Sequence, residues 1–416
     1  MTARVGVNEA DRVRNQAMGA GLIDDPYPRY HELRATGPVH QGTIPDHLGI
    51  TDARGSHPDG LDFSAYSWAT VDEILRDNET FSNSSYAPTL EPFIGRTILQ
   101  MDGAEHRRYR GLAQPGLTRG DMVRWQATWV DPYLDRLFDR IGAEPDRRAD
   151  LNVLLCSLLP VHTIAKAWGI ADADIDRVHE LAITQLTAGG DYTAAIRAAE
   201  ELAGLLREQI ELRRIEPADD LISLMCTAEV VDDDGDRHRL TDDEVLAFAR
   251  LLLTAGAGTT YRGLGSLLVA LLSNPEQLER VRDDRARLEA TIEEGLRWEQ
   301  PLSAVTRLAA RDCELEGVAI PSGSFVHAAI GAANHDPTRW DDPDQFDIMR
   351  PPRPHVTFGG GAHFCIGIHL ARMEMKAGLD AVLDRLPGIR FDPAEPTPYI
   401  TGLTFRMPTA LPVTWD

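Results

Sequence analysis

Three glycines precede a cysteine in residues 358–367, FGGGAHFCIG. Glycine permits backbone conformations and close approaches that other residues do not, so a flat ligand could lie against this loop. The pattern that follows predicts a helix from about 366 to 386, with the sulfur of Cys365 at its N-terminus. There the helix dipole and the backbone N–H groups are expected to lower the pKa of the thiol. The resulting thiolate would be a soft metal ligand.

The same cysteine has other interpretations. A buried structural cysteine after a glycine turn is the most common role for an arbitrary residue of this type. The loop lacks the lysine of a phosphate-binding GxxxxGK[ST] loop, and no clear strand leads into a GxGxxG spacing. A hydrolase with Cys365 as nucleophile would need an oriented base, and His363 is only two positions away.

Two further motifs decide between these interpretations. Glu294 and Arg297 form an ExxR pair in a helical pattern, and residues 343–350, PDQFDIMR, match PxxFxxxR. Together with FGGGAHFCIG, they resemble the ExxR, PxxFxxxR and FGxGxHxCxG motifs of the cytochrome P450 monooxygenases, in the same order. An ExxR pair alone occurs on many helix faces, so the combination carries the resemblance. It covers about residues 25–416 and implies the cytochrome P450 fold.

The resemblance implies a set of roles around haem b. Cys365 would be the axial thiolate ligand of the iron, which favours O–O cleavage. A buried charge network of Glu294, Arg297 and Arg350 would hold the cysteine loop. The other cofactor-binding residues implied are the loop residues Phe358, Gly359 and Gly367 and the propionate partners His106, Arg110, Arg307 and His363. His106 and Arg110 share one helix face, whereas for Arg307 an ordinary surface position is the alternative.

A long helix is predicted from the capping box at Thr241 and Glu244 to Ser273. At 1.5 Å per residue, its length of about 32 residues is roughly 48 Å. Residues 255–260, AGAGTT, lie in its middle. A glycine inside a helix costs about 1 kcal/mol relative to alanine. The two glycines therefore indicate either a close-packed partner or a local opening for ligand and water.

This segment resembles the oxygen-activation motif of the same family. By that resemblance, the catalytic residues are Thr259, Thr260 and Gly258, with the Thr259 hydroxyl helping to deliver protons to dioxygen. Gly258 stands where the family usually has Asp or Glu. The usual proton relay is therefore altered in this chain.

The predicted substrate pocket is apolar and has no convergent charge, which suits a hydrophobic small molecule. Its residues, placed by the resemblance, are Tyr86, Phe93, Ile98, Leu251, Thr254, Ala255, Val305, Leu403 and Phe405. Each of them could equally be plain core. The set indicates hydroxylation or O-dealkylation of a terpenoid, a steroid or a methoxy-aromatic compound without choosing among them.

The 416 residues leave no room for an attached flavin or iron–sulfur domain. The resemblance therefore implies NAD(P)H electrons delivered by a ferredoxin reductase and a ferredoxin. Ferredoxins are usually acidic, so a local basic face is expected. Its candidates are Arg108, Arg119, Arg124, Arg353, Arg372 and Lys376. The alternative function is a haem-binding sensor or carrier of the same fold without oxygenase turnover, which Gly258 slightly favours.

The elements that must position these residues are mainly helical. Helices are predicted at about 28–36, 70–77 and 103–113 and through most of 120–300, with a long loop over 41–63 and an irregular stretch after 77. Alternating patterns in the last third predict short strands. The fold class is thus mainly α with a minor antiparallel β region (α+β), arranged as one domain over 21–416 after a loose arm over 1–20. Strict βα alternation is missing, which argues against a doubly wound dinucleotide fold.

Charge and composition exclude several partners. The chain has 42 Lys and Arg against 65 Asp and Glu, a net charge of −23, which repels nucleic acid and anionic membranes. Four separated cysteines without a CxxC pair fit a reducing compartment. The N-terminus has no apolar segment of a signal peptide or membrane anchor. We therefore expect a cytoplasmic, bacterial-type monomer that binds neither membrane nor nucleic acid.

Overall fold

The computed structural model describes residues 23–50, 61–187, 192–231, 235, 237–408 and 410–416. Helices make up most of this part of the chain, and short strands form small sheets beside them. The predicted fold class is therefore confirmed. The predicted arm over 1–20 lies outside the described residues. None of the helices within these ranges is both long and apolar enough to span a membrane.

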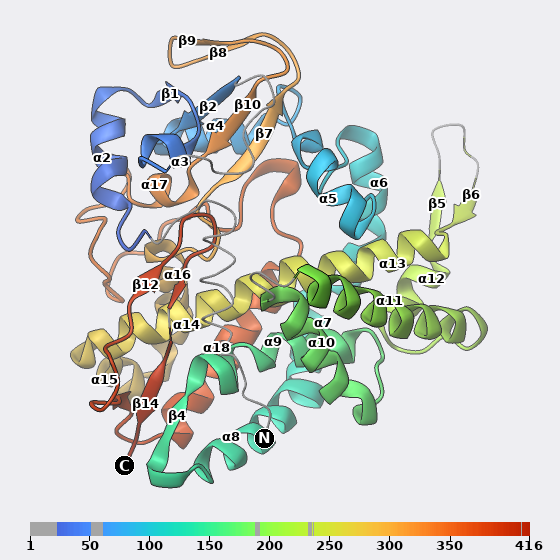
Figure 1. Ribbon diagram of the computed structural model, residues 1–416, viewed down its shortest axis with the longest axis vertical. Helices are drawn as coiled ribbons and strands as arrows, with labels where there is room; N and C mark the ends of the chain where they lie inside the picture. The colour runs from blue at the N-terminus through green and yellow to red at the C-terminus, as the bar shows by residue number, and fades with distance from the viewer. Residues whose placement is uncertain (1–22, 51–60, 188–191, 232–234, 236, 409) are drawn as a thin grey trace.

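The predicted long helix is present and crosses the molecule (Figure 1). It consists of α13 (Asp242–Leu251), a π-helical segment η7 (Leu252–Ala257) and α14 (Gly258–Ser273). The capping box at its start is formed: Glu244 N–H donates to Thr241 Oγ1 and Thr241 N–H donates to Glu244 Oε2. The π-helical segment was not predicted from the sequence. Such segments are rare and frequently lie at functional sites.

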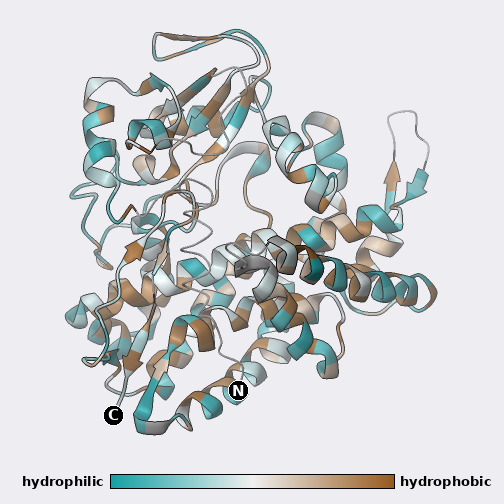
Figure 2. Ribbon diagram, in the orientation of Figure 1, coloured by the Kyte–Doolittle hydropathy of each residue, from teal (hydrophilic) through white to brown (hydrophobic). Residues whose placement is uncertain are grey.

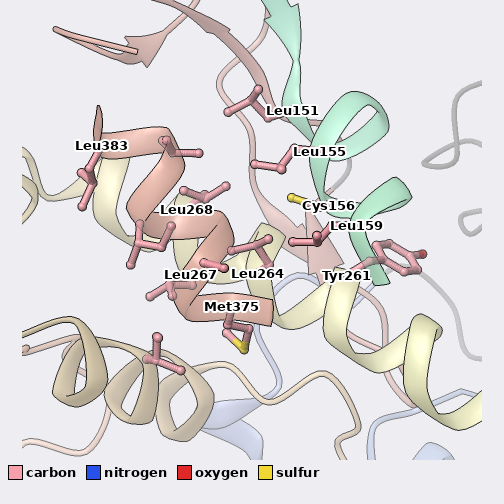
Figure 3. Close-up of a cluster of buried hydrophobic side chains, with 14 of the residues drawn as sticks. Leu151, Leu155, Cys156, Leu159, Tyr261, Leu264, Leu267, Leu268, Met375 and Leu383 are labelled. Carbon is pink, nitrogen blue, oxygen red and sulfur yellow. The ribbon is translucent and has the colours of Figure 1, made fainter. Parts of the chain in front are cut away.

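The largest hydrophobic core lies where α14 packs against α9 (Leu158–Ala167) and α18 (Ile368–Arg385). Figure 3 shows Leu159 of α9, Leu264 and Leu267 of α14 and Met375 of α18 in this core. Hydrophobic residues run along these central helices, whereas the outer helices alternate hydrophilic and hydrophobic residues (Figure 2). This alternation is typical of helices with one face against a core and one in water.

A five-stranded sheet joins segments that are far apart in the sequence. Its order is β1-β2-β10-β7-β3, and all pairs are antiparallel except β2 with β10. The strands are β1 (Val39–Gln41), β2 (Asp62–Ala65), β3 (Phe81–Ser82), β7 (Val305–Ala309) and β10 (Phe325–Ala328). Strands near the N-terminus thus lie beside strands of residues 305–328, as the blue and orange ribbons of Figure 1 show.

The prediction of a long loop over 41–63 was wrong at both ends of this range, and residues 51–60 lie outside the described part of the chain. This region contains α3 (Ile44–His47), which begins with a capping box at Thr43 and Asp46, and the start of β2. All four residues of β2 are buried, because the strand pairs with β1 on one side and β10 on the other. Pairing with distant strands, and not local periodicity, produces this strand. The stretch after residue 77 also proved partly helical, with α5 over Ala87–Ile94.

The predicted helices near 28, 70, 103 and 366 are confirmed as α2 (Tyr27–Thr36), α4 (Trp68–Arg76), α6 (Gly103–Ala113) and α18. The other α-helices are α7 (Arg119–Trp125), α8 (Asp131–Gly142), α10 (Ile175–Thr187), α11 (Tyr192–Ile215), α12 (Leu221–Thr227), α15 (Pro275–Asp283), α16 (Leu288–Trp298) and α17 (Ile330–Asn334). In a three-stranded sheet, β14 (Pro412–Thr414) lies between β4 (Arg148–Asp150) and β11 (Arg390–Phe391). The two-stranded sheets are β5 (Glu229–Val231) with β6 (Arg237–Arg239), β8 (Cys313–Leu315) with β9 (Val318–Ile320), and β12 (Ile400–Thr401) with β13 (Met407–Pro408).

Candidate active site

The cysteine loop is a tight turn that packs against the end of α4. Cys365 N–H donates to Phe358 O at 2.9 Å, which closes the loop at its base. Gly359 and Gly361 have φ angles of 73° and 62°, which favour glycine. A Cβ atom on Gly361 would lie 2.6 Å from Leu75 O and 2.8 Å from Arg76 Cα. Glycine at position 361 thus lets the backbone of the loop approach the backbone of α4.

The expected effect on the cysteine pKa was wrong. Burial raises the pKa of the Cys365 thiol above its ordinary value, and smaller effects of the Gly367 N–H, Arg110 and Arg372 oppose this shift. Gly367 is the N-cap of α18, which begins only at Ile368. Removing the thiolate from water therefore outweighs the favourable field at the helix terminus.

The predicted charge network is assembled and buried. Both guanidinium contacts from Arg297 to Glu294 measure 2.8 Å, and Arg350 Nε lies 3.2 Å from Glu294 Oε1. The exposed fractions of the three side chains are 1% for Arg297, 5% for Glu294 and 10% for Arg350. Arg297 also donates to the carbonyls of Pro343 and Gln345, so α16 is tied to the segment 343–350.

A connection from this network to the cysteine loop runs through Asn334 and Thr357. Arg297 Nη1 donates to Asn334 O at 2.9 Å, while the Asn334 side chain bonds Val356 N–H and the Thr357 hydroxyl. Thr357 Oγ1 in turn donates to Leu296 O at 2.7 Å. Sequence reasoning missed both residues, because neither stands in a recognisable motif. They hold the irregular segment that leads into the glycines.

Two histidines and an aspartate lie together beside the loop. The rings of His106 and His363 have centroids 4.1 Å apart, and His363 Nε2 lies 3.0 Å from Asp102 Oδ1. Burial, aided by His363 and Arg110, lowers the pKa of His106 to about 4. His106 is therefore neutral at pH 7, and its buried Nε2 has no hydrogen-bond partner among the described residues. Arg110 Nη2 donates to Phe364 O at 2.6 Å, next to Cys365.

Arg307 is buried on β7 with an exposed fraction of 5%. Its Nη1 donates to Thr306 O at 3.0 Å, its pKa is lowered by burial, and Asp102 and Tyr86 act electrostatically on it. Asp102 also acts electrostatically on His106, so the charge of one aspartate influences the pKa of both Arg307 on β7 and His106 on α6. A buried guanidinium and an unpartnered buried imidazole nitrogen suit the carboxylates of haem propionates. The residues present therefore fit this group.

Both explanations for the glycines of segment 255–260, a close-packed partner and a local opening, find support in the structure. A Cβ atom on Gly256 would lie 3.0 Å from Ile164 Cδ1, so α9 packs closely there. Ala255 is nevertheless exposed, and Thr259, whose Oγ1 donates to Ala255 O at 2.7 Å, is half-buried. Gly258 offers no side chain, and its carbonyl accepts a hydrogen bond from Arg262 Nη1 at 2.6 Å. The neighbouring Thr260 is buried.

The predicted substrate residues fall into two groups. Ile98, Leu251 and Leu403 are buried, and Leu403 packs in a core cluster with Tyr30 and Tyr66. Half-buried positions are those of Tyr86, Thr254, Val305 and Phe405, whereas Ala255 is exposed and the Phe93 side chain lies outside the described part.

Three of these side chains have defined contacts. The Tyr86 hydroxyl accepts from Thr306 N–H at 3.0 Å, beside Arg307. Phe405 packs on the Arg262 guanidinium at 4.5 Å, and Thr254 Oγ1 donates to Arg250 O. The hydrogen bond holds Tyr86 beside Arg307, a predicted partner of a haem propionate. The role of Tyr86 in substrate binding is still a prediction.

The predicted basic face is largely neutralised by ion pairs. Arg372 contacts Glu293 at 2.6 Å and Lys376 contacts Glu289 at 2.9 Å. Arg124 pairs with Asp121 and Asp219, and Arg353 lies 3.9 Å from Asp341. Arg119 is exposed on α7.

Comparisons with known proteins agree with this geometry. A family model described as Cytochrome P450 matches residues 183–388. The chain is 33% identical over 412 residues to the cytochrome P450 monooxygenase PikC of Streptomyces venezuelae, covering 96% of this chain and 93% of the relative. The solved structure of cytochrome P450 CYP109Q5 from Chondromyces apiculatus superposes with a TM-score of 0.82 at 29% identity, covering 100% of this chain and 99% of that one. A structure of CYP109E1 from Bacillus megaterium in complex with testosterone has a TM-score of 0.78 at 26% identity, covering 94% and 99%.

Proposed function

Because the chain belongs to the cytochrome P450 family and is therefore a haem monooxygenase, we propose that Cys365 ligates its haem iron and that its substrate is an apolar small molecule. The relative PikC is named a monooxygenase, which supports this function over the alternative of a haem-binding sensor or carrier of the same fold. The enzyme is an oxidoreductase that uses haem and O2. The cysteine loop supports the ligand assignment. Among the described cysteines, Cys365 is the one that is half-buried and stands in a glycine-rich turn, and hydrogen bonds connect this turn to the charge network.

Each cluster around the loop has a role in this proposal. His106 and Arg307 bind the propionates, the first as a neutral N–H donor and the second as a buried cation. Glu294, Arg297 and Arg350 fix the segment that carries Cys365. A haem iron with a thiolate ligand supplies the chemistry that cleaves dioxygen. Thr259 holds and passes a proton at its Oγ1.

The proposed substrates are hydroxylated or O-dealkylated in an apolar pocket. The known structure with testosterone is that of a fold neighbour, so steroids are the first compounds to screen, followed by terpenoids and methoxy-aromatics. The Arg262 guanidinium lies 4.7 Å from the ring centroid of Tyr261 and 4.5 Å from that of Phe405, so it is a charged group beside a predicted pocket residue. Electrons reach the haem from NAD(P)H by way of a ferredoxin reductase and a ferredoxin.

The ligand assignment is tested with the variant Cys365→Ala. The wild-type protein should bind haem b and show the strongly red-shifted Soret band of thiolate ligation in its ferrous carbonyl complex. Cys365→Ala should lose this band, because no other thiol replaces the ligand. Cys313→Ala, which removes the other half-exposed described thiol on β8, is the control and should keep it. An unchanged carbonyl spectrum in Cys365→Ala would show that the assignment is wrong.

A further inference from the structure

A buried arginine lies one helical turn beyond Gly258. Arg262 on α14 has an exposed fraction of 2%, and its Nη1 donates to Gly258 O at 2.6 Å. Side chains on a helix lean toward its N-terminus, and residues at i and i+4 share a face. The guanidinium therefore reaches back over position 258, where glycine leaves the backbone accessible. Arginine is seldom buried this deeply, so its position calls for an explanation.

Hydrogen bonds from side chains accompany the π-helical segment η7. Thr254 Oγ1 donates to Arg250 O at 2.9 Å, and Thr259 Oγ1 donates to Ala255 O. Arg262 makes a third contact with a carbonyl four residues earlier, where η7 ends and α14 begins. The backbone hydrogen-bond pattern changes at such a junction. Because hydrogen bonds from charged donors are stronger than those from hydroxyls, Arg262 should hold this backbone most firmly of the three.

The contact also restrains the residue that follows Gly258. The Gly258 carbonyl and the Thr259 N–H belong to one planar peptide group, so holding the carbonyl also orients the N–H. Gly258 has φ −64° and ψ −39°, an ordinary helical conformation, but glycine lacks the Cβ atom that would restrict its backbone to it. Part of the restraint on this peptide therefore has to come from its surroundings, and Arg262 provides such a contact.

Two aromatic rings restrain the guanidinium in turn. Its carbon atom lies 4.7 Å from the ring centroid of Tyr261 and 4.5 Å from that of Phe405. Phe405 belongs to the turn between β12 and β13, which a second buried arginine holds. Arg406 donates to Gly402 O at 2.7 Å and forms a buried ion pair with Glu299. The ring of Phe405 therefore has a fixed position beside α14.

We propose that Arg262 is a positioning residue of the oxygenation reaction, which holds the Gly258–Thr259 peptide in place while the ring of Phe405 holds the guanidinium. The proposal rests on the proposed function, in which the Thr259 hydroxyl handles protons. Arg262 itself takes part in no chemical step. A predicted pocket residue and the oxygen-activation segment are thereby connected through one side chain, so the position of the Phe405 ring affects how well protons are delivered.

Amide hydrogen exchange of the haem-loaded protein tests the restraint without turnover. Arg262→Met keeps an unbranched side chain that fills the space between the rings, but it has no N–H donor. The amides of 258–263 should exchange about tenfold faster in this variant, because the hydrogen bond from a charged donor no longer opposes local opening. Unchanged exchange over 258–263 would overturn the proposal.

Turnover tests the consequence of the lost restraint, with a compound that shifts the haem spin state of the wild type and a ferredoxin system. Arg262→Met should bind this compound with the dissociation constant of the wild type but lose most of the product formed per NADH consumed. Arg262→Lys, which keeps a charged donor, should retain more of this yield. A wild-type yield in Arg262→Met would contradict the proposed role.

Arg34→Met is the matched control for damage to the fold. The Arg34 side chain is also largely buried, at 10% exposure, and donates to the carbonyls of Tyr66 and Ala332, but it lies on α2. Its loss should lower thermal stability without changing the yield or the exchange over 258–263. Equal losses of yield in Arg34→Met and Arg262→Met would show general destabilisation and would refute positioning by Arg262.

A double variant tests the contact with Phe405. Phe405→Leu removes the ring but keeps an apolar side chain, so it should lower the yield and speed exchange over 258–263. Combined with Arg262→Met, it should cause no further loss, because both changes remove the same contact. Additive losses would overturn the connection between the two residues. A full yield in Thr259→Ala, or a wild type without the carbonyl spectrum of thiolate ligation, would contradict the proposed function instead.

Discussion

Glu294 is the residue on which the two arginines of the charge network converge. It accepts from Arg297 and Arg350 and also from Asp347 N–H at 2.9 Å. The neighbouring Glu293 pairs with Arg372 but is 37% exposed. Two adjacent glutamates of α16 therefore each form an ion pair with arginine, but the pair of Glu294 is buried and that of Glu293 is accessible to solvent.

Replacing Glu294 by Gln should lower the free energy of unfolding by about 3–5 kcal/mol, because two buried guanidinium groups lose their counter-charge. Glu293→Gln should cost at most about 1 kcal/mol, since an exposed ion pair is screened by water. Denaturant titration of the two variants measures the difference. Equal losses would show that burial of the network does not determine its contribution.

For individual residues of the candidate site, the sequence predicted the positions of those that stand in motifs. Glu294, Arg297 and Arg350 are brought together as expected, and hydrogen bonds connect them to the segment that leads into the cysteine loop. Asn334 and Thr357, which connect them, were missed because a hydrogen bond between a side chain and a distant backbone leaves no spacing pattern. The pKa of Cys365 was mispredicted, since the degree of burial follows from packing and not from the position of the residue in a motif.

Among the elements, the long helix was predicted almost to its ends, because its capping box and its apolar periodicity are local properties. Its π-helical segment was not, since the change from i→i+4 to i→i+5 hydrogen bonds leaves no spacing pattern in the sequence. The cysteine loop was likewise predicted only in part. Its glycines were recognised from the sequence, but the contact of Gly361 with α4 depends on the fold, which brings residues 75 and 361 together.

The contact of Gly361 predicts the effect of a single methyl group. Gly361→Ala should be destabilised by at least about 1–2 kcal/mol from its left-handed backbone alone, and the Cβ atom should also push the loop away from Leu75 O. Haem retained through gel filtration should therefore fall, together with thermal stability. Gly204→Ala in α11, where a Cβ atom would meet nothing within 4 Å, is the control and should keep both. Normal haem retention in Gly361→Ala would show that the loop does not depend on this contact.

For the whole molecule, the limit of sequence reasoning was the pairing of distant segments. Strands β1 and β2 complete a sheet with β7 and β10, and β7 carries Arg307. The first third of the chain therefore helps to position a cofactor-binding candidate of the last third. Local patterns cannot reveal this pairing, because two-residue periodicity is weak in strands of three to five residues.

The distribution of charge over the molecule gives the last prediction, on electron delivery. Among the candidate cations, Arg124, Arg353, Arg372 and Lys376 already have carboxylate partners, so these four side chains offer an acidic ferredoxin little unpaired positive charge. Exposed Arg119 on α7 should then contribute strongly to docking. Arg119→Glu should slow reduction by ferredoxin at low salt, and the difference from the wild type should shrink as the Debye length falls from about 10 Å at 0.1 M to about 3 Å at 1 M.

Arg29→Glu is the matched control, because it makes the same change in net charge on α2, well separated from α7 in Figure 1. It should affect reduction much less, since beyond a Debye length its charge is screened from the docking face. Stopped-flow reduction at several salt concentrations distinguishes the two variants. Equal slowing by both would indicate that the ferredoxin responds to total charge, and an unchanged rate in Arg119→Glu would exclude α7 from the docking face.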